Sequence, residues 1–148
     1  MLTENLQIYI DTKELAKLLL TYQPNVPRIA RYGEYGKMVA MACEAMDLIY
    51  VANSDERSRT ETIVRILQVF GGIRSRICLL AEVGSLSPRQ SVSLMRLADK
   101  IGRQATGWRN ASQRQNRRDT GQCGSAALMT GEMGYHFHGS KGFERETE

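Results

Sequence analysis

The chain has 148 residues, of which 42% are hydrophobic, so it is long enough to bury the core of one domain. No apolar run approaches the roughly 18 residues that a membrane-spanning helix needs. The N-terminal residues lack the basic region and cleavage site of a signal peptide. These features argue against membrane-embedded and secreted classes, and we expect a soluble, cytoplasmic protein.

Charge is distributed unevenly along the chain. Residues 1–56 carry five basic and eight acidic residues, residues 57–118 carry thirteen basic and three acidic residues, and residues 119–148 carry two basic and five acidic residues. The middle region therefore has a net charge of +10, between two regions of −3 each. Such a local field favours a polyanion partner or an acidic protein surface.

The first part of the chain predicts two amphipathic helices separated by a proline-rich break. Apolar residues at steps of three and four predict a helix over about residues 3–22. Asp11 and Thr12 are expected to kink or restart it, because both compete for backbone hydrogen bonds. Two prolines in the following QPNVPR segment prevent continuation. A second helix is predicted over about residues 32–52, with an apolar stripe of Tyr35, Met38, Val39, Ala42, Met46, Ile49 and Tyr50.

A third helix is predicted from about Arg57 or Thr60 to Val83. Its apolar stripe consists of Ile63, Ile66, Leu67, Phe70, Ile73, Ile77 and Leu80. Gly71 and Gly72 lie in the middle of this helix, where each glycine costs about 1 kcal/mol relative to alanine. They indicate either the close approach of a neighbouring helix or a tolerated weak point with a slight kink.

The turn before the fourth helix has the clearest boundary signals in the chain. Gly84 suits the position just after a helix. Ser87 is a favourable N-cap, Pro88 suits the first helical position, and Gln90 completes a capping box. The connection is short, so the third and fourth helices should be antiparallel neighbours. The fourth helix has an apolar stripe of Met95, Ala98, Ile101, Gly102, Ala105 and Trp108.

The apolar stripe ends at Trp108, whereas basic residues continue to Arg118. From Asp119 onward the chain is rich in glycine and lacks helical periodicity, so residues 119–148 are predicted to be a flexible, disordered extension. Docking of its few apolar residues on the bundle or on a partner stays open. The whole pattern predicts an all-α protein, an antiparallel up-and-down four-helix bundle over residues 1–118.

The sequence lacks common catalytic motifs, with no G-x-x-x-x-G-K-[ST], no H-E-x-x-H and no G-x-S-x-G. The two histidines, His136 and His138, lie in the extension with Cys123, and their spacing matches no common zinc site. A di-iron bundle requires histidines on the bundle helices, and the predicted helices contain none. We therefore predict a protein that is not an enzyme and has no metal or cofactor. Cys43 and Cys78 are expected to be small core residues.

The strongest functional signal is the set of basic residues in the last two helices. One face of the fourth helix, opposite its apolar stripe, is predicted to carry Arg89, Arg96, Lys100, Arg103 and Arg114. Arg74 and Arg76 of the third helix can join this face. Such a face can neutralise phosphates without reading base sequence. The alternatives are docking on an acidic protein and a merely solvated surface, although ordinary surfaces mix charges of both signs.

An aromatic and basic cluster, PRIARYGEYGK, lies at the start of the second helix. Tyr32 and Tyr35, together with Arg28 and Arg31, could form a stacking platform for unpaired bases. Tyrosines at a helix start more often cover the edge of the core, so both interpretations stay open.

Several of these segments together resemble a known family. They are the proline-rich break, the second helix RYGEYGKMVAMACEAMDLIYVANS, the LSPRQ start of the fourth helix and its IGRQATGWRNA continuation. In this layout the chain is similar to the Avd-like proteins, the accessory variability determinants of diversity-generating retroelements. It is also similar to four-helix-bundle proteins encoded by intervening sequences in large-subunit rRNA genes. The resemblance covers about residues 15–111, through motifs that reflect packing as much as function.

The resemblance implies a concrete role. Avd-like proteins form barrel-like homopentamers of four-helix bundles with a basic surface, and they are not enzymes. They bind the reverse transcriptase of the element and nucleic acid, and they support error-prone copying of template RNA into cDNA. The acidic first half and the extension after Asp119 depart from the family pattern. The resemblance carries over as candidate contacts Arg74, Arg76, Arg89, Arg96, Lys100, Arg103 and Arg109, and the basic face adds Arg114.

Three functional hypotheses follow. The leading hypothesis is a non-enzymatic accessory protein that binds nucleic acid and a reverse transcriptase through its basic surface and acts as a homo-oligomer. The alternative is an interaction scaffold that docks an acidic protein partner and has no direct role with nucleic acid. A less favoured third hypothesis is an enzyme that uses Cys123, His136 and His138.

Overall fold

The computed structural model describes the backbone of residues 1–129 and the side chains of residues 1–121. The described residues are helical, without a β-strand. The chain divides into two units, Met1–Arg114 and Gln115–Glu148, and helix α5 contributes residues to both. The long helices are α1 (Gln7–Tyr22), α3 (Glu34–Ser54), α4 (Arg59–Glu82) and α5 (Pro88–Met129). The short elements are the 3₁₀ turns η1 (Thr3–Asn5) and η2 (Gln23–Asn25) and the single-turn helix α2 (Arg28–Tyr32).

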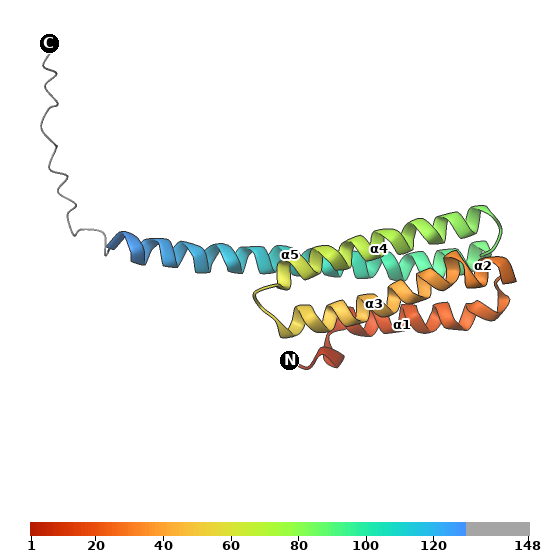
Figure 1. The fold of residues 1–148 in the computed structure, drawn as a ribbon, viewed down its shortest axis with the longest axis horizontal. Coiled ribbons are helices and arrows are strands. Elements are labelled where there is room, and N and C mark those ends of the chain that lie inside the picture. The colour runs from red at the N-terminus through yellow and green to blue at the C-terminus, as the bar shows by residue number, and fades with distance from the viewer. Residues whose placement is uncertain (130–148) are drawn as a thin grey trace, which may run out of the picture. The chain divides into compact units, whose positions relative to one another are not determined.

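Within the unit Met1–Arg114 the four long helices pack as a bundle, as the sequence predicts. Consecutive long helices run in opposite directions and are joined by short connections at the bundle ends (Figure 1). Helix α3 packs against both α1 and α4. Side-chain contacts from α5 reach α4 and α1, through Asp99 and Lys100 respectively. Each helix therefore has one inward and one outward face.

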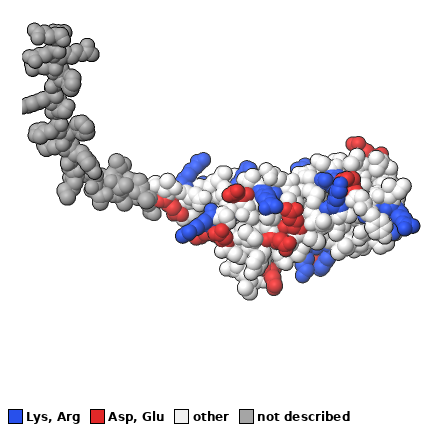
Figure 2. Space-filling model, viewed as in Figure 1, with Lys and Arg blue, Asp and Glu red and all other residues white. Residues whose placement is uncertain are grey.

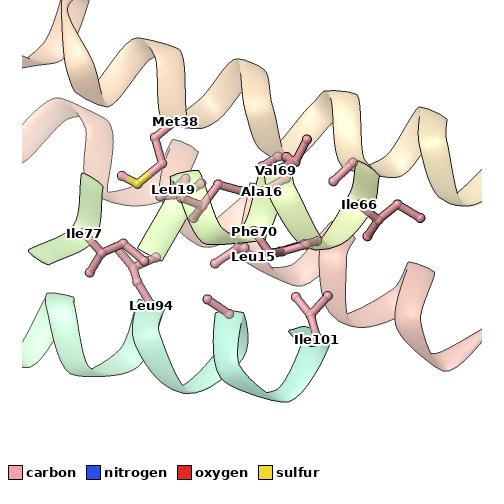
Figure 3. Packing of buried hydrophobic residues seen from close by; sticks show 14 of the residues in the cluster. Leu15, Ala16, Leu19, Met38, Ile66, Val69, Phe70, Ile77, Leu94 and Ile101 are labelled. Atoms are coloured by element: carbon pink, nitrogen blue, oxygen red, sulfur yellow. The ribbon is translucent and has the colours of Figure 1, made fainter. Parts of the chain in front are cut away.

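The core is a single cluster to which all four long helices contribute. Figure 3 shows Leu15 and Leu19 of α1, Met38 of α3, and the facing side chains of α4 and α5 converging on one interior. Full burial of an aliphatic or aromatic side chain of this size contributes about 1.5–3 kcal/mol. The apolar periodicity of the sequence thus supplies the main force that holds the helices together.

The turn between α4 and α5 has the predicted helix-ending glycine and the predicted capping box. Gly84 has a φ of 76°, in the left-handed region that glycine adopts without strain. Its N–H donates to Ala81 O at 3.1 Å and the next N–H donates to Leu80 O at 2.9 Å, which is a Schellman motif. Ser87 and Gln90 form the reciprocal capping box, with N–H···O distances of 3.0 and 3.2 Å. The start of α5 is therefore set by local sequence.

Helix α1 is continuous through Asp11 and Thr12, so the predicted kink or restart is wrong. Thr12 donates its hydroxyl to Ile8 O at 2.7 Å, a bond that is compatible with the helix. The Asp11 carboxylate accepts from the Gln7 amide at 3.0 Å and from α5. Both polar side chains are satisfied within the fold and do not compete for the helical backbone.

A separate helical turn, which the sequence pattern did not predict, precedes the second long helix. The single turn α2 precedes Gly33, and the long helix α3 begins at Glu34. Arg31 closes the proline-rich break by donating to Pro24 O at 2.8 Å and to Val26 O at 3.1 Å. This arginine stabilises the connection between α1 and α3 through backbone carbonyls.

Three side chains of α3 and α4 do not lie where the sequence pattern places them. Cys43 and Cys78 were expected in the core, but both are exposed. Tyr50 was assigned to the apolar stripe but is 62% exposed. Ala45 and Ala52, which the predicted stripe omitted, are fully buried, as is the predicted Ala42. The inward face of α3 therefore includes these alanines and excludes Tyr50.

The two central glycines of α4 have different surroundings. A Cβ atom at Gly72 would lie 2.5 Å from Met41 Cε of α3, so the close-approach interpretation holds there. A Cβ atom at Gly71 would meet no atom within 4 Å. Helix α4 nonetheless runs without interruption through both positions.

Helix α5 is longer than predicted and continues to Met129, so residues 119–129 are helical and not irregular. Side chains support the helix at this point: Gln115 donates to Asp119 Oδ1 at 3.1 Å, and Thr120 donates to Asn116 O at 2.8 Å. Residues 126–129 are Ala, Ala, Leu and Met, which have high intrinsic helix propensity. The rest of the predicted extension, residues 130–148, lies outside the described residues.

Candidate nucleic-acid interface

Three arginines follow the outward face of α5 and define what we call the outer row: Arg89, Arg96 and Arg103. They are spaced seven residues apart, which is nearly two helical turns, so they project in similar directions about 10 Å apart along the axis. Leu94, Ala98 and Ile101 on the opposite face are fully buried. All three arginines are exposed, and among the described residues none has an acidic partner within ion-pair distance. Their charge is therefore available to a ligand.

Lys100 belongs to a different environment, although the sequence places it on the same face. Its Nζ lies 3.1 Å from the carboxylate of Asp11 on α1. The Asp11 side chain is only 7% exposed, whereas that of Lys100 is 49% exposed. Gln104 donates to the same carboxylate at 2.7 Å. Lys100 thus compensates a buried charge and holds α5 against α1.

The ionisation of Asp11 reflects this cluster. Burial raises the pKa of its carboxyl group, but hydrogen bonds from Gln104, Lys100 and Gln7 outweigh that effect and hold the pKa below its usual range. The Gln104 Oε1 atom is buried and has no hydrogen-bond partner. Because Lys100 and Gln104 of α5 both bind the carboxylate of Asp11 on α1, the cluster is a structural contact between these two helices.

The two predicted arginines of α4 are also paired with acidic residues. Arg74 Nε lies 3.0 Å from Asp99 Oδ1 of α5, and both side chains are partly exposed. Arg76 Nε lies 3.1 Å from Glu34 Oε2 of α3, and its Nη1 donates to Gly72 O at 3.2 Å. Lys37 and, to a smaller extent, Arg76 lower the pKa of Glu34. Arg76 is consequently a bridge between α3 and α4.

The remaining two candidates lie farther along α5. Arg109 is half-buried, and its Nε atom is buried with no hydrogen-bond partner. Arg114 is exposed and donates from Nε to Asn110 O at 3.3 Å. Arg117 and Arg118, which the candidate set omits, are exposed on the same helix within the second unit. The sequence does contain a signal for these two residues, because the run of arginines continues after Trp108, where the apolar stripe ends.

The structure thus separates six of the eight predicted residues into two classes, which are the ion-paired cations and the unpaired outer row. Arg74, Arg76 and Lys100 each have an acidic partner, and the partners of Arg76 and Lys100 come from the acidic first half of the chain. Basic and acidic side chains are interspersed over the face seen in Figure 2. The outer row is therefore a set of three evenly spaced cations without acidic partners on one face of α5, whereas the two candidate cations of α4 are paired.

The proposed tyrosine platform is not assembled. Tyr32 is 75% exposed, but Tyr35 is fully buried, and its hydroxyl donates to Leu19 O of α1. Burial raises the pKa of the Tyr35 hydroxyl well above its usual value. Tyr35 therefore fixes the contact between α1 and α3, and Tyr32 alone is available for stacking.

Within the described part of the chain, no group of three or more His, Cys, Asp or Glu side chains could hold a metal ion. The weak zinc candidate of Cys123, His136 and His138 lies outside the described side chains. No helix among the residues described has the length and apolar character to cross a bilayer.

The sequence matches no protein-family model, and a comparison with curated proteins also finds no match. The resemblance to Avd-like proteins therefore depends on the helix layout, the proline-rich break and the RYGEYGKMVAMACEAMDLIYVANS, LSPRQ and IGRQATGWRNA segments.

Proposed function

We propose that the protein is a non-enzymatic, Avd-like accessory protein of a diversity-generating retroelement that acts in the cytoplasm. In this proposal its basic surface binds nucleic acid and the reverse transcriptase and supports mutagenic cDNA synthesis from template RNA. The main supporting observation is the outer row, where Arg89, Arg96 and Arg103 have no acidic partner among the described residues. The helical bundle and the resemblance support the retroelement role.

The outer row suits phosphate binding in a specific way. Guanidinium groups donate two parallel hydrogen bonds to a phosphate, and each phosphate contact releases condensed counterions. Three contacts to a single strand predict a salt slope of about −2 per protomer, or a roughly twentyfold loss of affinity between 50 and 200 mM salt. A homopentamer would present five such rows, and avidity would raise the overall affinity without new contacts.

A charge-reversal experiment tests nucleic-acid binding. The triple variant Arg89→Glu, Arg96→Glu, Arg103→Glu should lose binding to a short RNA at low salt, measured by fluorescence anisotropy, while its circular dichroism stays unchanged. The matched control reverses three exposed cations elsewhere, Lys13, Arg28 and Arg57, with the same change in net charge. Equal loss in both variants would show that only net charge matters and would contradict a localised site.

The reverse-transcriptase part of the proposal needs a separate test. The protein should copurify with the reverse transcriptase of its element after nuclease treatment, and its addition should stimulate cDNA synthesis from template RNA. Copurification together with no RNA binding by the isolated protein would favour the scaffold alternative. No copurification and no stimulation would contradict the retroelement role and leave only the nucleic-acid interface.

A further inference from the structure

A groove with a volume of about 570 Å³ lies between α4 and α5, next to the outer row. Arg74 and Arg103 lie on its two walls, and the Thr106 hydroxyl, which donates to Gly102 O at 2.9 Å, can still accept a hydrogen bond. The partly buried Leu67 supplies apolar lining, and Phe70, which is only 1% exposed, lies beneath it in the core. The volume falls within the range typical of small-ligand sites. The groove therefore combines apolar surface, cations and a hydrogen-bonding group.

Glycines keep the groove open. Gly71 of α4 and Gly102 of α5 both line it, and a Cβ atom at either position would meet nothing within 4 Å. A glycine inside a helix costs about 1 kcal/mol relative to alanine. Gly72 differs because Met41 fills the space over it. Close packing accounts for Gly72, but no contact within the fold accounts for Gly71 and Gly102.

An ion pair crosses this groove. Arg74 and Asp99, 3.0 Å apart, come from opposite walls. A second hollow of about 370 Å³ continues beyond them, lined by Gly71, Arg74 and Met95 among others. The two hollows share Gly71 and Arg74 as lining residues, so they are neighbours on the surface of the two helices. Arg103 links the groove to the outer row because it belongs to both.

We infer that this groove binds an unpaired nucleotide of a single-stranded nucleic acid whose flanking phosphates lie on the outer row. The inference rests on the proposed nucleic-acid binding and adds strand selectivity to it. A nucleobase has a flat apolar surface with polar edges, which suits the apolar lining beside Thr106 and Asp99. Arg74 and Arg103 suit its phosphates. A paired base is stacked inside a duplex and cannot enter, so double strands contact the outer row alone.

Filling the groove tests the inference without damaging the fold. In the double variant Gly71→Leu, Gly102→Leu the new side chains occupy free space, and leucine has higher helix propensity than glycine, so the Tm should not fall. Affinity for oligouridine should fall about tenfold, because the filled groove no longer admits a base. Affinity for a duplex RNA of equal length should stay within about twofold. Oligothymidine measured in parallel distinguishes RNA from single-stranded DNA as the preferred strand.

Matched variants separate this inference from the proposed function. Gly121→Leu changes the same helix beyond both the groove and the outer row, and it should leave both affinities unchanged. If the double variant binds oligouridine as the wild type does, or loses duplex binding equally, the groove has no selective role. If the wild type binds neither strand type, the proposed function itself fails. A third outcome is also possible: the Arg89→Glu, Arg96→Glu variant loses all binding, but the groove variant binds as the wild type does. That result would support the proposed function and reject the role of the groove.

Asp99→Asn tests the inference through an expected gain of affinity for oligouridine, whereas filling the groove should cause a loss. The substitution frees Arg74 from its ion pair and removes a carboxylate that repels phosphate, so oligouridine affinity should rise about threefold, in line with the strength of an exposed ion pair. Unchanged or weaker affinity would contradict a phosphate at Arg74.

Discussion

Arg96 and Lys100 are one helical turn apart on α5, yet they are in different environments. Arg96 is exposed with no acidic partner among the described residues, whereas Lys100 is bound to the buried Asp11 of α1. Four residues advance a helix by slightly more than one turn, and this small rotation directs Lys100 toward α1. Basic residues on one helix face can therefore have separate roles: Lys100 stabilises the fold, and the outer row remains free for a ligand.

The largest effect should come from reversing the structural cation. Lys100→Glu places a second carboxylate beside Asp11 and leaves that buried charge without compensation. The free energy of unfolding in urea should fall by about 3 kcal/mol, at the low end for a broken buried pair because Lys100 is half-exposed. Arg96→Glu, the control on the outer row, should change it by no more than about 0.5 kcal/mol. Similar losses in both variants would remove the distinction between the two classes.

The pH dependence of stability should reveal the same cluster. The pKa of Asp11 is lower in the folded protein than its ordinary value of 3.8, so its charged form stabilises the fold. This contribution is complete above the unfolded pKa and is lost as pH falls through the lower folded pKa. Asp11→Asn should make the unfolding free energy less dependent on pH in that acidic range. Unaltered pH dependence in the variant would show that other carboxylates account for it.

A smaller effect is expected at the start of α5. Ser87→Ala removes the side-chain acceptor of the capping box and should lower the free energy of unfolding by about 1 kcal/mol. Arg89 lies in the same helical turn, so fraying of that turn should lower RNA affinity slightly. The loss should be smaller than in Arg89→Ala, because Ser87→Ala keeps the charge of Arg89. Chemical denaturation and anisotropy on the same samples measure both effects. An affinity loss equal to that of Arg89→Ala would mean that the cap positions the guanidinium group.

The smallest effect on stability should come from the outer row itself. Arg96→Ala should leave the unfolding free energy within about 0.5 kcal/mol of the wild type. It should reduce the slope of log affinity against log salt by about 0.7 for a single strand, the value for one phosphate contact. A slope that does not change would show that Arg96 contacts no phosphate.

Local features of the fold could be predicted from the sequence. The capping box of Ser87 and Gln90 and the left-handed Gly84 involve residues within one turn of each other, so their geometry depends on adjacent chemistry alone. The apolar stripes predict the inward faces because a helix repeats every 3.6 residues. Errors arose at single positions such as Cys43 and Tyr50, where residue type was used without knowledge of how closely the neighbouring helix packs.

The sequence by itself determined that the chain forms amphipathic helices and that one face of α5 is rich in arginine. Only the tertiary structure decided which cations are free. Asp11 lies 89 residues before Lys100, and Glu34 lies 42 residues before Arg76, so no local pattern links these pairs. Ion pairing depends on distances of a few ångströms, whereas helix periodicity gives only the direction of a side chain. The packing of α1, α3 and α4 brings the acids into contact and leaves Arg89, Arg96 and Arg103 outside.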